Sequence, residues 1–262
     1  MLLQRGGHAV IGGLTGIGKT FLLMELAGAF MLGVAPFSIP SWSAKKARVL
    51  YIDKELGPYM FADRLKARFT PEELDNFGSS LLVMAKPKGM QLSNPEVMTW
   101  LRDYCAGEGI DVLMLDPISR FHYWDENGGG GAQVVEAIET IADGHVATIV
   151  THHFRKPAQG RDAEHYDPLS QYNFRGSVGT KLVEDASFSL TLAMKDVQTA
   201  PFKRWKLSTR LEKTRNTGAD LADFNLLVNW NNDRRVTFET KGTDHRVVTP
   251  IEGPKRHYRF PA

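Results

Sequence analysis

Short apolar runs alternate with segments of helical length over the first 185 residues of the chain. The runs carry too few polar positions for strands that keep one face in water. The segments between them have the length and apolar spacing of helices. The predicted strands are His8–Ile11, Val49–Asp53, Leu81–Ala85, Val112–Asp116 and Val146–Thr151, and the predicted helices are Lys19–Met31, Pro58–Phe69, Pro95–Cys105 and Ala132–Ala142. This alternation predicts an α/β fold in which helices cover both faces of a mostly parallel sheet.

The pattern changes beyond Asp185, where strand-like runs follow one another without helical segments between them. Two of the breaks, Asn216-Thr217-Gly218 and Asn231-Asn232-Asp233, have the composition of turns. The runs are Ser187–Ala193, Trp205–Thr214, Phe224–Trp230 and Val236–Glu239. We therefore expect the parallel core to carry an antiparallel extension at its C-terminal end.

Two polar segments have no clear secondary-structure pattern. Trp124–Gly131 contains four consecutive glycines, and Arg155–Phe174 contains two prolines and a glycine. Each follows a predicted strand, at the end of a parallel sheet where ligands bind. Loops of this length in a compact domain are usually functional or disordered.

Length and charge set limits on the organisation of the chain. The 262 residues are 42% apolar, which suffices for one large domain or two small ones. Charge is nearly balanced overall, with 32 lysines and arginines against 30 acidic residues. Residues 201–262, however, hold 13 basic against 7 acidic residues. We expect one domain over residues 1–240 and a basic tail over residues 241–262, which is either a solvated surface or a contact for a polyanion.

Cysteine usage and the longest apolar stretch bear on the environment of the protein. Cys105 is the only cysteine, so the chain forms no internal disulfide, and no Cys or His residues have the spacing of a structural zinc site. Phe21–Phe37 carries Glu25 and ends in glycine and proline, which favours a buried helix over a membrane span. The N-terminus shows no secretory signal. We expect a soluble, cytoplasmic protein.

The strongest motif lies between the first predicted strand and the first predicted helix. Gly13-Leu14-Thr15-Gly16-Ile17-Gly18-Lys19-Thr20 fits the pattern G-x-x-x-x-G-K-[ST] of a phosphate-binding loop. The glycines let backbone N–H groups converge on phosphate oxygens at the positive end of a helix. Lys19 would reach the terminal phosphates of ATP, and the Thr20 hydroxyl would bind Mg²⁺.

Two further strands end in carboxylates. Asp116 ends a buried strand at the edge that faces the phosphate loop, where it is a candidate for holding Mg²⁺; otherwise it caps a turn. Glu55 follows another strand and could deprotonate the attacking water if that strand lies beside the phosphate loop. Asp53 is its rival, because residues two apart on a strand face the same way. A solvated surface triplet over Asp53–Glu55 is the structural alternative.

The predicted strand Val146–Thr151 leads into His152 and His153. Neighbouring residues on a strand face opposite ways, so at most one of the two histidines points at the nucleotide. A neutral imidazole near the γ-phosphate could sense it and transmit its presence to the following loop. The alternative is a histidine pair bonded to local backbone groups. Zinc binding is not expected, because no companion ligand pair exists.

In this order, the motifs resemble those of RecA-like ATPases, and among them the plasmid-type RepA hexameric replicative DNA helicases. The resemblance extends from about Gly7 to Trp230. Beyond the phosphate loop it rests on Leu115–His122, Phe174–Ser177 and Glu212–Asn216. It implies a RecA-like P-loop fold and a ring of identical subunits with ATP bound between neighbours.

The resemblance assigns roles to individual residues. It makes Glu55 the catalytic glutamate, Asp116 the metal-associated aspartate and His153 the sensor of the γ-phosphate, with His152 as an alternate. Lys213 and Arg215 match the basic pair that such proteins insert into the site of the neighbouring subunit, which would stabilise charge in the transition state. Arg175 either contacts phosphate across the interface or anchors the loop before it.

The resemblance also places the two polar segments, as Arg120–Gly131 and Arg155–Phe174, in the central pore, where they would touch DNA. Both combine cationic and aromatic residues, a combination that suits single-stranded nucleic acid, although acidic residues dilute the charge. The candidate nucleic-acid contacts are Arg120, His122, Arg155, Lys156 and Arg161.

These expectations together describe a Mg²⁺-dependent ATPase that acts on DNA as a hexameric replicative helicase. One alternative is a recombinase-like ATPase that forms filaments on DNA. Another is an assembly or regulatory module that ATP switches and that never engages DNA. A small-molecule kinase fits least, because neither long loop resembles a lid that binds a phosphate acceptor.

Overall fold

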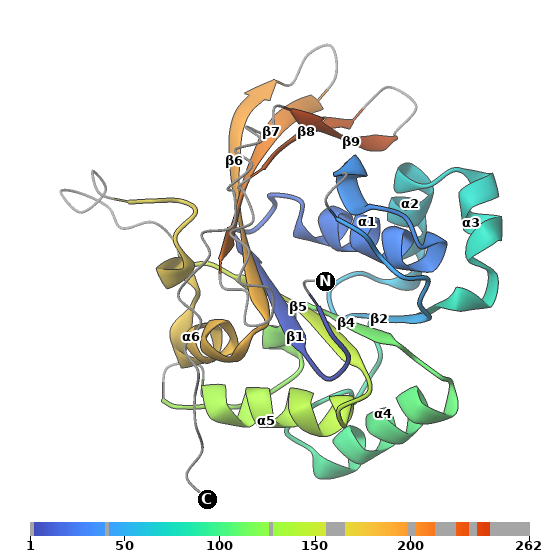
Figure 1. The fold of residues 1–262 in the computed structure, drawn as a ribbon. Coiled ribbons are helices and arrows are strands. Elements are labelled where there is room, and N and C mark those ends of the chain that lie inside the picture. The colour runs from blue at the N-terminus through green and yellow to red at the C-terminus, as the bar shows by residue number, and fades with distance from the viewer. Residues whose placement is uncertain are drawn as a thin grey trace, which may run out of the picture.

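The protein folds around a mixed sheet, which the computed structural model describes for residues 3–39, 42–125, 128–155, 166–198, 203–212, 224–230 and 235–241 (Figure 1). Within these residues nine strands lie in the order β3-β2-β4-β5-β1-β6-β7-β8-β9. The strands are β1 (His8–Gly13), β2 (Val49–Asp53), β3 (Leu81–Ala85), β4 (Val112–Asp116), β5 (Ala147–His153), β6 (Phe188–Gln198), β7 (Lys203–Glu212), β8 (Asn225–Trp230) and β9 (Val236–Lys241). The predicted parallel core and antiparallel extension are both confirmed.

The inner parallel strands are apolar because helices cover both of their faces. The strand at the end of the sheet, β3, was expected to be buried as well but is only partly buried, because it has a neighbouring strand on one side alone. Every residue of β1, β2 and β4 is buried, as their continuous apolar sequences predict. Side chains that alternate along each strand divide the core into two clusters, one on each face of the sheet. The helices are α1 (Lys19–Leu32), α2 (Pro58–Arg68) and α3 (Pro71–Phe77) on one face, and α4 (Pro95–Gly107), α5 (Gly131–Ala142) and α6 (Gly176–Asp185) on the other. Short 3-10 turns lie at Pro36–Ser38, Gly78–Ser80, Ile118–Arg120 and Gln171–Asn173.

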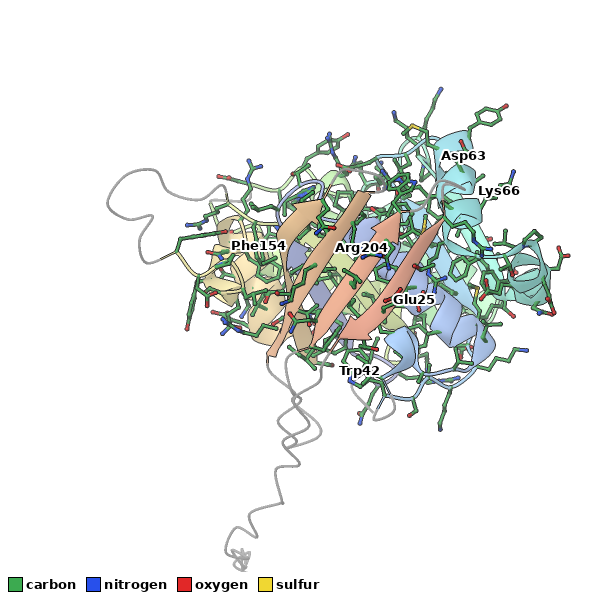
Figure 2. All side chains as sticks on the ribbon, turned by 90° about the horizontal axis from the view of Figure 1, so that it is seen from above. Glu25, Trp42, Asp63, Lys66, Phe154 and Arg204 are labelled. Carbon is green, nitrogen blue, oxygen red and sulfur yellow. The ribbon has the colours of Figure 1, made fainter. Side chains whose placement is uncertain are left out.

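The antiparallel strands bend over α1 and enclose it. Figure 1 shows β6–β9 rising from the sheet beside this helix, and Figure 2 shows them side by side from above, with Arg204 on β7. On the inner face Trp230 packs edge-on against Phe21 of α1, with ring centroids 5.8 Å apart. Because α1 also packs against the parallel strands, α2 and α3, ten of its fourteen residues are buried. The sequence of this helix is accordingly apolar nearly all round.

The first strand of the predicted extension belongs to both parts of the sheet. β6 pairs in parallel with β1 on one side and antiparallel with β7 on the other. Sequence analysis identified the strand but assigned it to the extension alone. The parallel pairing places β6 beside the strand that leads into the phosphate loop.

Sequence analysis missed two helices for different reasons. α3 begins with a capping box, in which Thr70 accepts a bond from the Glu73 backbone and the Glu73 side chain bonds back to Thr70. The Thr-x-x-Glu spacing was therefore present as a signal. α6 contains Gly176 and Gly179, which lower its intrinsic propensity. A Cβ at Gly179 would lie 2.7 Å from Phe174, so this helix depends on a close tertiary contact that composition does not reveal.

Candidate nucleotide-binding site

The phosphate loop joins β1 to α1 at the carboxyl ends of the parallel strands. Gly16 and Gly18 adopt left-handed backbone angles, with φ of 82° and 102°, which side chains other than glycine rarely tolerate. A Cβ at Gly13 would lie 2.2 Å from Ile17, so the first glycine permits the loop to fold back closely on itself. Nothing lies within 4 Å of the Cβ position of Gly16 among the described residues. The loop thus presents its backbone on an open side.

Lys19 supplies the positive charge of the phosphate loop. Its Nζ donates hydrogen bonds to the carbonyl oxygens of Gly13 and Leu14, each at 2.9 Å. The side chain is buried, with 7% of the residue exposed. Burial lowers the pKa of Lys19 to about 8, against the opposing effect of the Asp116 and Glu55 carboxylates. Lys19 therefore remains protonated at neutral pH and suits the binding of phosphate oxygens.

His153 connects Lys19 to Glu55. Its Nδ1 lies 3.2 Å from Lys19 Nζ and 3.5 Å from the Thr15 hydroxyl, so Nδ1 is the acceptor. Its Nε2 lies 3.9 Å from Oε1 of Glu55. Burial and the charge of Lys19 lower the pKa of His153, which favours a neutral ring with its proton on Nε2. The ring then faces the phosphate loop on one side and a carboxylate on the other.

His152 points away from the phosphate loop, as strand alternation predicts. Its side chain is fully buried, its ring centroid lies 6.0 Å from that of Phe174, and its Nδ1 lies 2.9 Å from the carbonyl oxygen of His153. Burial lowers the pKa of His152 to about 4. Of the two histidines, His153 is therefore the one that faces the phosphate loop.

The buried His152 should make the fold sensitive to acid. Between pH 6.5 and 4 the unfolded chain binds more protons at this position than the folded chain, so stability falls as pH falls. We expect this residue to cost about 2 kcal/mol of unfolding free energy between pH 7 and pH 5. His152→Asn retains a donor for the His153 carbonyl and should abolish that part of the loss. Urea unfolding at both pH values measures it.

The exposed His145 provides the control for this prediction. His145→Asn should leave the pH dependence of the unfolding free energy as in the wild type, because that side chain lies in a surface turn. Equal pH dependence in wild type and His152→Asn would contradict the assignment of a buried, neutral His152.

Asp53 and Glu55 have different environments. Asp53 is buried, and its Oδ1 accepts the backbone N–H groups of Glu55 and Leu56 at 2.9 and 2.5 Å. Burial raises the pKa of Asp53 to about 6. Glu55 is exposed, and its Oε1 lies 3.8 Å from Nε of Arg120 as well as near His153. Asp53 thus shapes the turn that presents Glu55, and Glu55 is the carboxylate that reaches the open site.

Sequence analysis made the catalytic role of Glu55 conditional on its strand lying beside the phosphate loop, and this condition is not met. β2 does not neighbour β1, because β4 and β5 lie between them in the sheet. Glu55 nevertheless approaches His153, because Glu55 follows β2 and His153 ends β5, and only β4 lies between these two strands.

Asp116 lies at the end of β4 with both carboxylate oxygens engaged. Oδ2 accepts a hydrogen bond of 2.9 Å from the Tyr51 hydroxyl, and Oδ1 accepts one from the Thr151 hydroxyl. The residue is buried, with 4% exposed. Burial and the adjacent Asp116 raise the pKa of Tyr51 well above its usual value, so Tyr51 is a donor at every working pH. Sequence analysis missed Tyr51 and Thr151, although each lies two residues before the end of its strand.

The remaining predicted residues lie around this core of the site. Arg120 is exposed next to Glu55. His122, in contrast, is buried, and its ring stacks on that of Trp124 with the centroids 5.7 Å apart. In this structure the His122 side chain therefore does not face solvent, as a nucleic-acid contact would require. Arg155 and Arg175 are exposed, and the Arg175 N–H donates to the carbonyl of His153. Lys156, Arg161, Lys213 and Arg215 lie outside the described residues.

The donor set fits a nucleoside triphosphate with Mg²⁺. Backbone N–H groups of the loop and Lys19 suit phosphates, while the Thr20 hydroxyl and the Asp116 carboxylate are the hard oxygen donors that Mg²⁺ prefers. Among the described residues no group of three His, Cys, Asp or Glu side chains could itself hold a metal ion. Mg²⁺ at this site would therefore depend on phosphate oxygens and water for most of its ligands.

The length and composition of the helices show whether any of them could cross a membrane. Within the described part of the chain, no helix has the length and apolar character that a bilayer crossing requires.

The fold and the phosphate loop define the class of this protein as a P-loop ATPase with a RecA-like fold. Residues 1–159 match the protein family described as AAA domain, and the chain belongs to that family. This span includes β1, the phosphate loop, Glu55, Asp116 and His153. Family membership supports nucleotide hydrolysis, for which Mg²⁺ is the usual metal.

A solved structure extends the likeness beyond residue 159. The crystal structure of flagellar accessory protein FlaH from Methanocaldococcus jannaschii superposes with a TM-score of 0.56, over 91% of this chain and 91% of that chain. The two sequences are 13% identical over the match, so the comparison shows a shared fold alone. The expected RecA-like fold is confirmed.

Proposed function

We propose that the chain is a Mg²⁺-dependent ATPase that couples hydrolysis to translocation on DNA or its unwinding, as a homohexameric replicative helicase. The observation that carries this proposal is the position of His153. It contacts the phosphate loop and faces Glu55, and it is followed at once by one of the two segments assigned to DNA. A change at the γ-phosphate therefore has a short path to that segment.

The chemistry follows from the side chains of one subunit. Glu55 accepts the proton of the attacking water, and the ring of His153 faces this carboxylate, with its Nε2 3.9 Å from Oε1. Lys19 neutralises charge on the terminal phosphates. Thr20 and Asp116 would hold Mg²⁺, which when bound neutralises further phosphate charge. Glu55 and Asp116 follow or end parallel strands, and Lys19 and Thr20 begin α1 at the same edge of the sheet.

The base of the segment after His153 is anchored to the site. Phe154 forms a β-bridge with Phe174, and the Arg155 N–H donates to the carbonyl of Asn173 at 2.8 Å. The Arg175 N–H returns to the His153 carbonyl at 3.2 Å. Both ends of the segment are thereby tied to the strand that carries the sensor. The other segment starts at Arg120, which lies beside Glu55.

The proposal assigns the second half of the site to a neighbouring subunit. Lys213 and Arg215 follow β7, and the resemblance to the RepA-type helicases gives them the role of cations supplied in trans. Such cations stabilise the charge of phosphoryl transfer. This division of the site would make hydrolysis depend on assembly.

The dependence of ATPase activity on single-stranded DNA tests the proposed function. We expect an oligonucleotide to stimulate turnover several-fold and the stimulation to decline as salt rises, because phosphate contacts release counterions. Arg155→Gln should weaken the stimulation without changing basal turnover. Arg102→Gln on α4, outside both segments, is the matched control.

Solution mass with a non-hydrolysable ATP analogue and DNA distinguishes the alternatives. A closed hexamer supports the helicase, whereas helical filaments would indicate a recombinase-like ATPase. Turnover that ignores DNA would contradict a DNA motor and favour an assembly module switched by ATP. The same fold also serves a protein described as a flagellar accessory protein, so these measurements, rather than the fold, decide between the alternatives.

A further inference from the structure

Two uncharged hydroxyl groups hold the Asp116 carboxylate from opposite sides. Tyr51 comes from β2 and Thr151 from β5, the two strands that flank β4 in the sheet. All three residues are buried, with at most 4% of any one exposed. We call these three residues the hydroxyl clamp. It is a feature that the assigned roles of Lys19, Glu55 and His153 do not require.

Strand register explains how the hydroxyl clamp forms. Met114 pairs with Tyr51 on β2 and with Ile149 on β5. Asp116, two residues beyond Met114, faces the same side of the sheet as Tyr51 and Thr151. Tyr51 is long enough to reach forward along the strands, and its ring is fixed edge-on against Phe61 at 4.9 Å. Thr151 is short and reaches Asp116 from the adjacent strand.

The chemistry of the two donors matters as much as their position. A buried carboxylate needs hydrogen bonds, and a lysine or arginine would provide them at the cost of cancelling its charge. Tyr51 and Thr151 are neutral, so they fix the carboxylate without cancelling that charge. Each carboxylate oxygen has about two acceptor sites, so one donor apiece leaves the others available.

We propose that Tyr51 and Thr151 are positioning residues that hold the Asp116 carboxylate oriented for the Mg²⁺ that accompanies the nucleotide. The inference rests on the ATPase part of the proposed function and is independent of DNA. Outer partners that orient a metal-binding group typically contribute 10–100-fold to metal affinity. We expect loss of either hydroxyl to raise the Mg²⁺ concentration at the midpoint of Mg²⁺-dependent nucleotide binding by about 10-fold.

The chain offers a matched control for each donor. Thr148 is also on β5 and fully buried, but its hydroxyl has no hydrogen-bond partner within the described residues, and it faces the other side of the sheet. Tyr59 on α2 is 88% exposed. Thr148→Val and Tyr59→Phe therefore remove the same atoms as Thr151→Val and Tyr51→Phe without touching Asp116.

The experiment measures binding of a fluorescent ADP analogue while Mg²⁺ is titrated from an EDTA-treated start. In EDTA, all variants should bind the analogue with affinity within about 2-fold of wild type, because phosphate-loop contacts are unchanged. The Mg²⁺ midpoint should rise about 10-fold in Tyr51→Phe and Thr151→Val. It should stay at the wild-type value in both controls and in Thr151→Ser, which retains the hydroxyl. Circular dichroism and thermal unfolding establish that each variant is folded.

Three results would overturn the inference. One is a Mg²⁺ midpoint that does not move in Tyr51→Phe and Thr151→Val. Another is an equal shift in Thr148→Val or in Thr151→Ser, which would indicate general loosening of β5. The third is wild-type nucleotide binding that ignores Mg²⁺. Failure of DNA to stimulate turnover would refute the proposed helicase but leave this result unaffected, so the two failures are distinguishable.

Discussion

Glu55→Gln should lower the maximal rate of ATP hydrolysis by about 10²–10⁴-fold, the usual contribution of a general base. Glutamine keeps the size and hydrogen-bonding reach of the side chain but cannot accept the proton of the attacking water. Nucleotide affinity should change little, since Glu55 lies across from Lys19, on the far side of His153. Steady-state turnover and equilibrium binding of an ATP analogue measure the two effects separately.

Asp53→Asn is the control, because an asparagine Oδ1 still accepts the N–H groups of Glu55 and Leu56. It also removes a carboxylate that burial disfavours, as the pKa of about 6 indicates. This variant should retain much of the wild-type turnover. Loss of turnover in Asp53→Asn together with retention in Glu55→Gln would reverse the two roles.

Arg215→Ala should reduce turnover by about 10³–10⁵-fold, the range for a cation that acts on the transferring phosphoryl group. Binding of nucleotide should persist, because the phosphate loop belongs to the other subunit of the proposed interface. Mixing this variant with Lys19→Ala should recover part of the activity, since some interfaces then combine an intact Lys19 with an intact Arg215. Turnover of the separate and mixed variants measures this recovery.

Arg204→Ala is a suitable control, because Arg204 lies on β7, the strand that precedes Arg215 in the sequence. Arg204 donates to Asn229 on the outer surface of β7 and β8, so its loss should leave turnover unchanged. Full activity of Arg215→Ala, or wild-type activity that stays constant on dilution of a monomer, would contradict a shared site.

Sequence patterns predicted the parallel strands closely for a physical reason. β2, β3 and β4 have the predicted bounds. For β2 and β4 the reason is burial, which requires continuous apolar runs, and each of these two strands ends in an aspartate at the carboxyl edge of the sheet. The phosphate loop was equally clear, since the positive φ values of Gly16 and Gly18 restrict these positions to glycine. Sequence analysis missed α6 because its two glycines lower the helix propensity, and the close approach of Gly179 to Phe174 is not visible in the sequence.

The sequence predicted only some of the residues of the candidate site. Spacing placed Asp53 and Glu55 on one side of a strand and left both open as the base. Burial and the two backbone N–H bonds to Asp53 distinguish them, and these depend on the turn after β2. Tyr51 and Thr151 carry no motif, since a tyrosine or threonine in an apolar strand is ordinary.

The amino-acid sequence by itself determined the class of chemistry: a glycine loop, a lysine and strand-ending carboxylates make a nucleotide site wherever a parallel sheet aligns its carboxyl ends. Only the tertiary structure decided which side chains meet there. Contacts such as those of His153 with Lys19 and Glu55 join residues more than 90 positions apart. They are set by strand order and register, which no local pattern encodes, because pairing energy comes from partners distant in the chain.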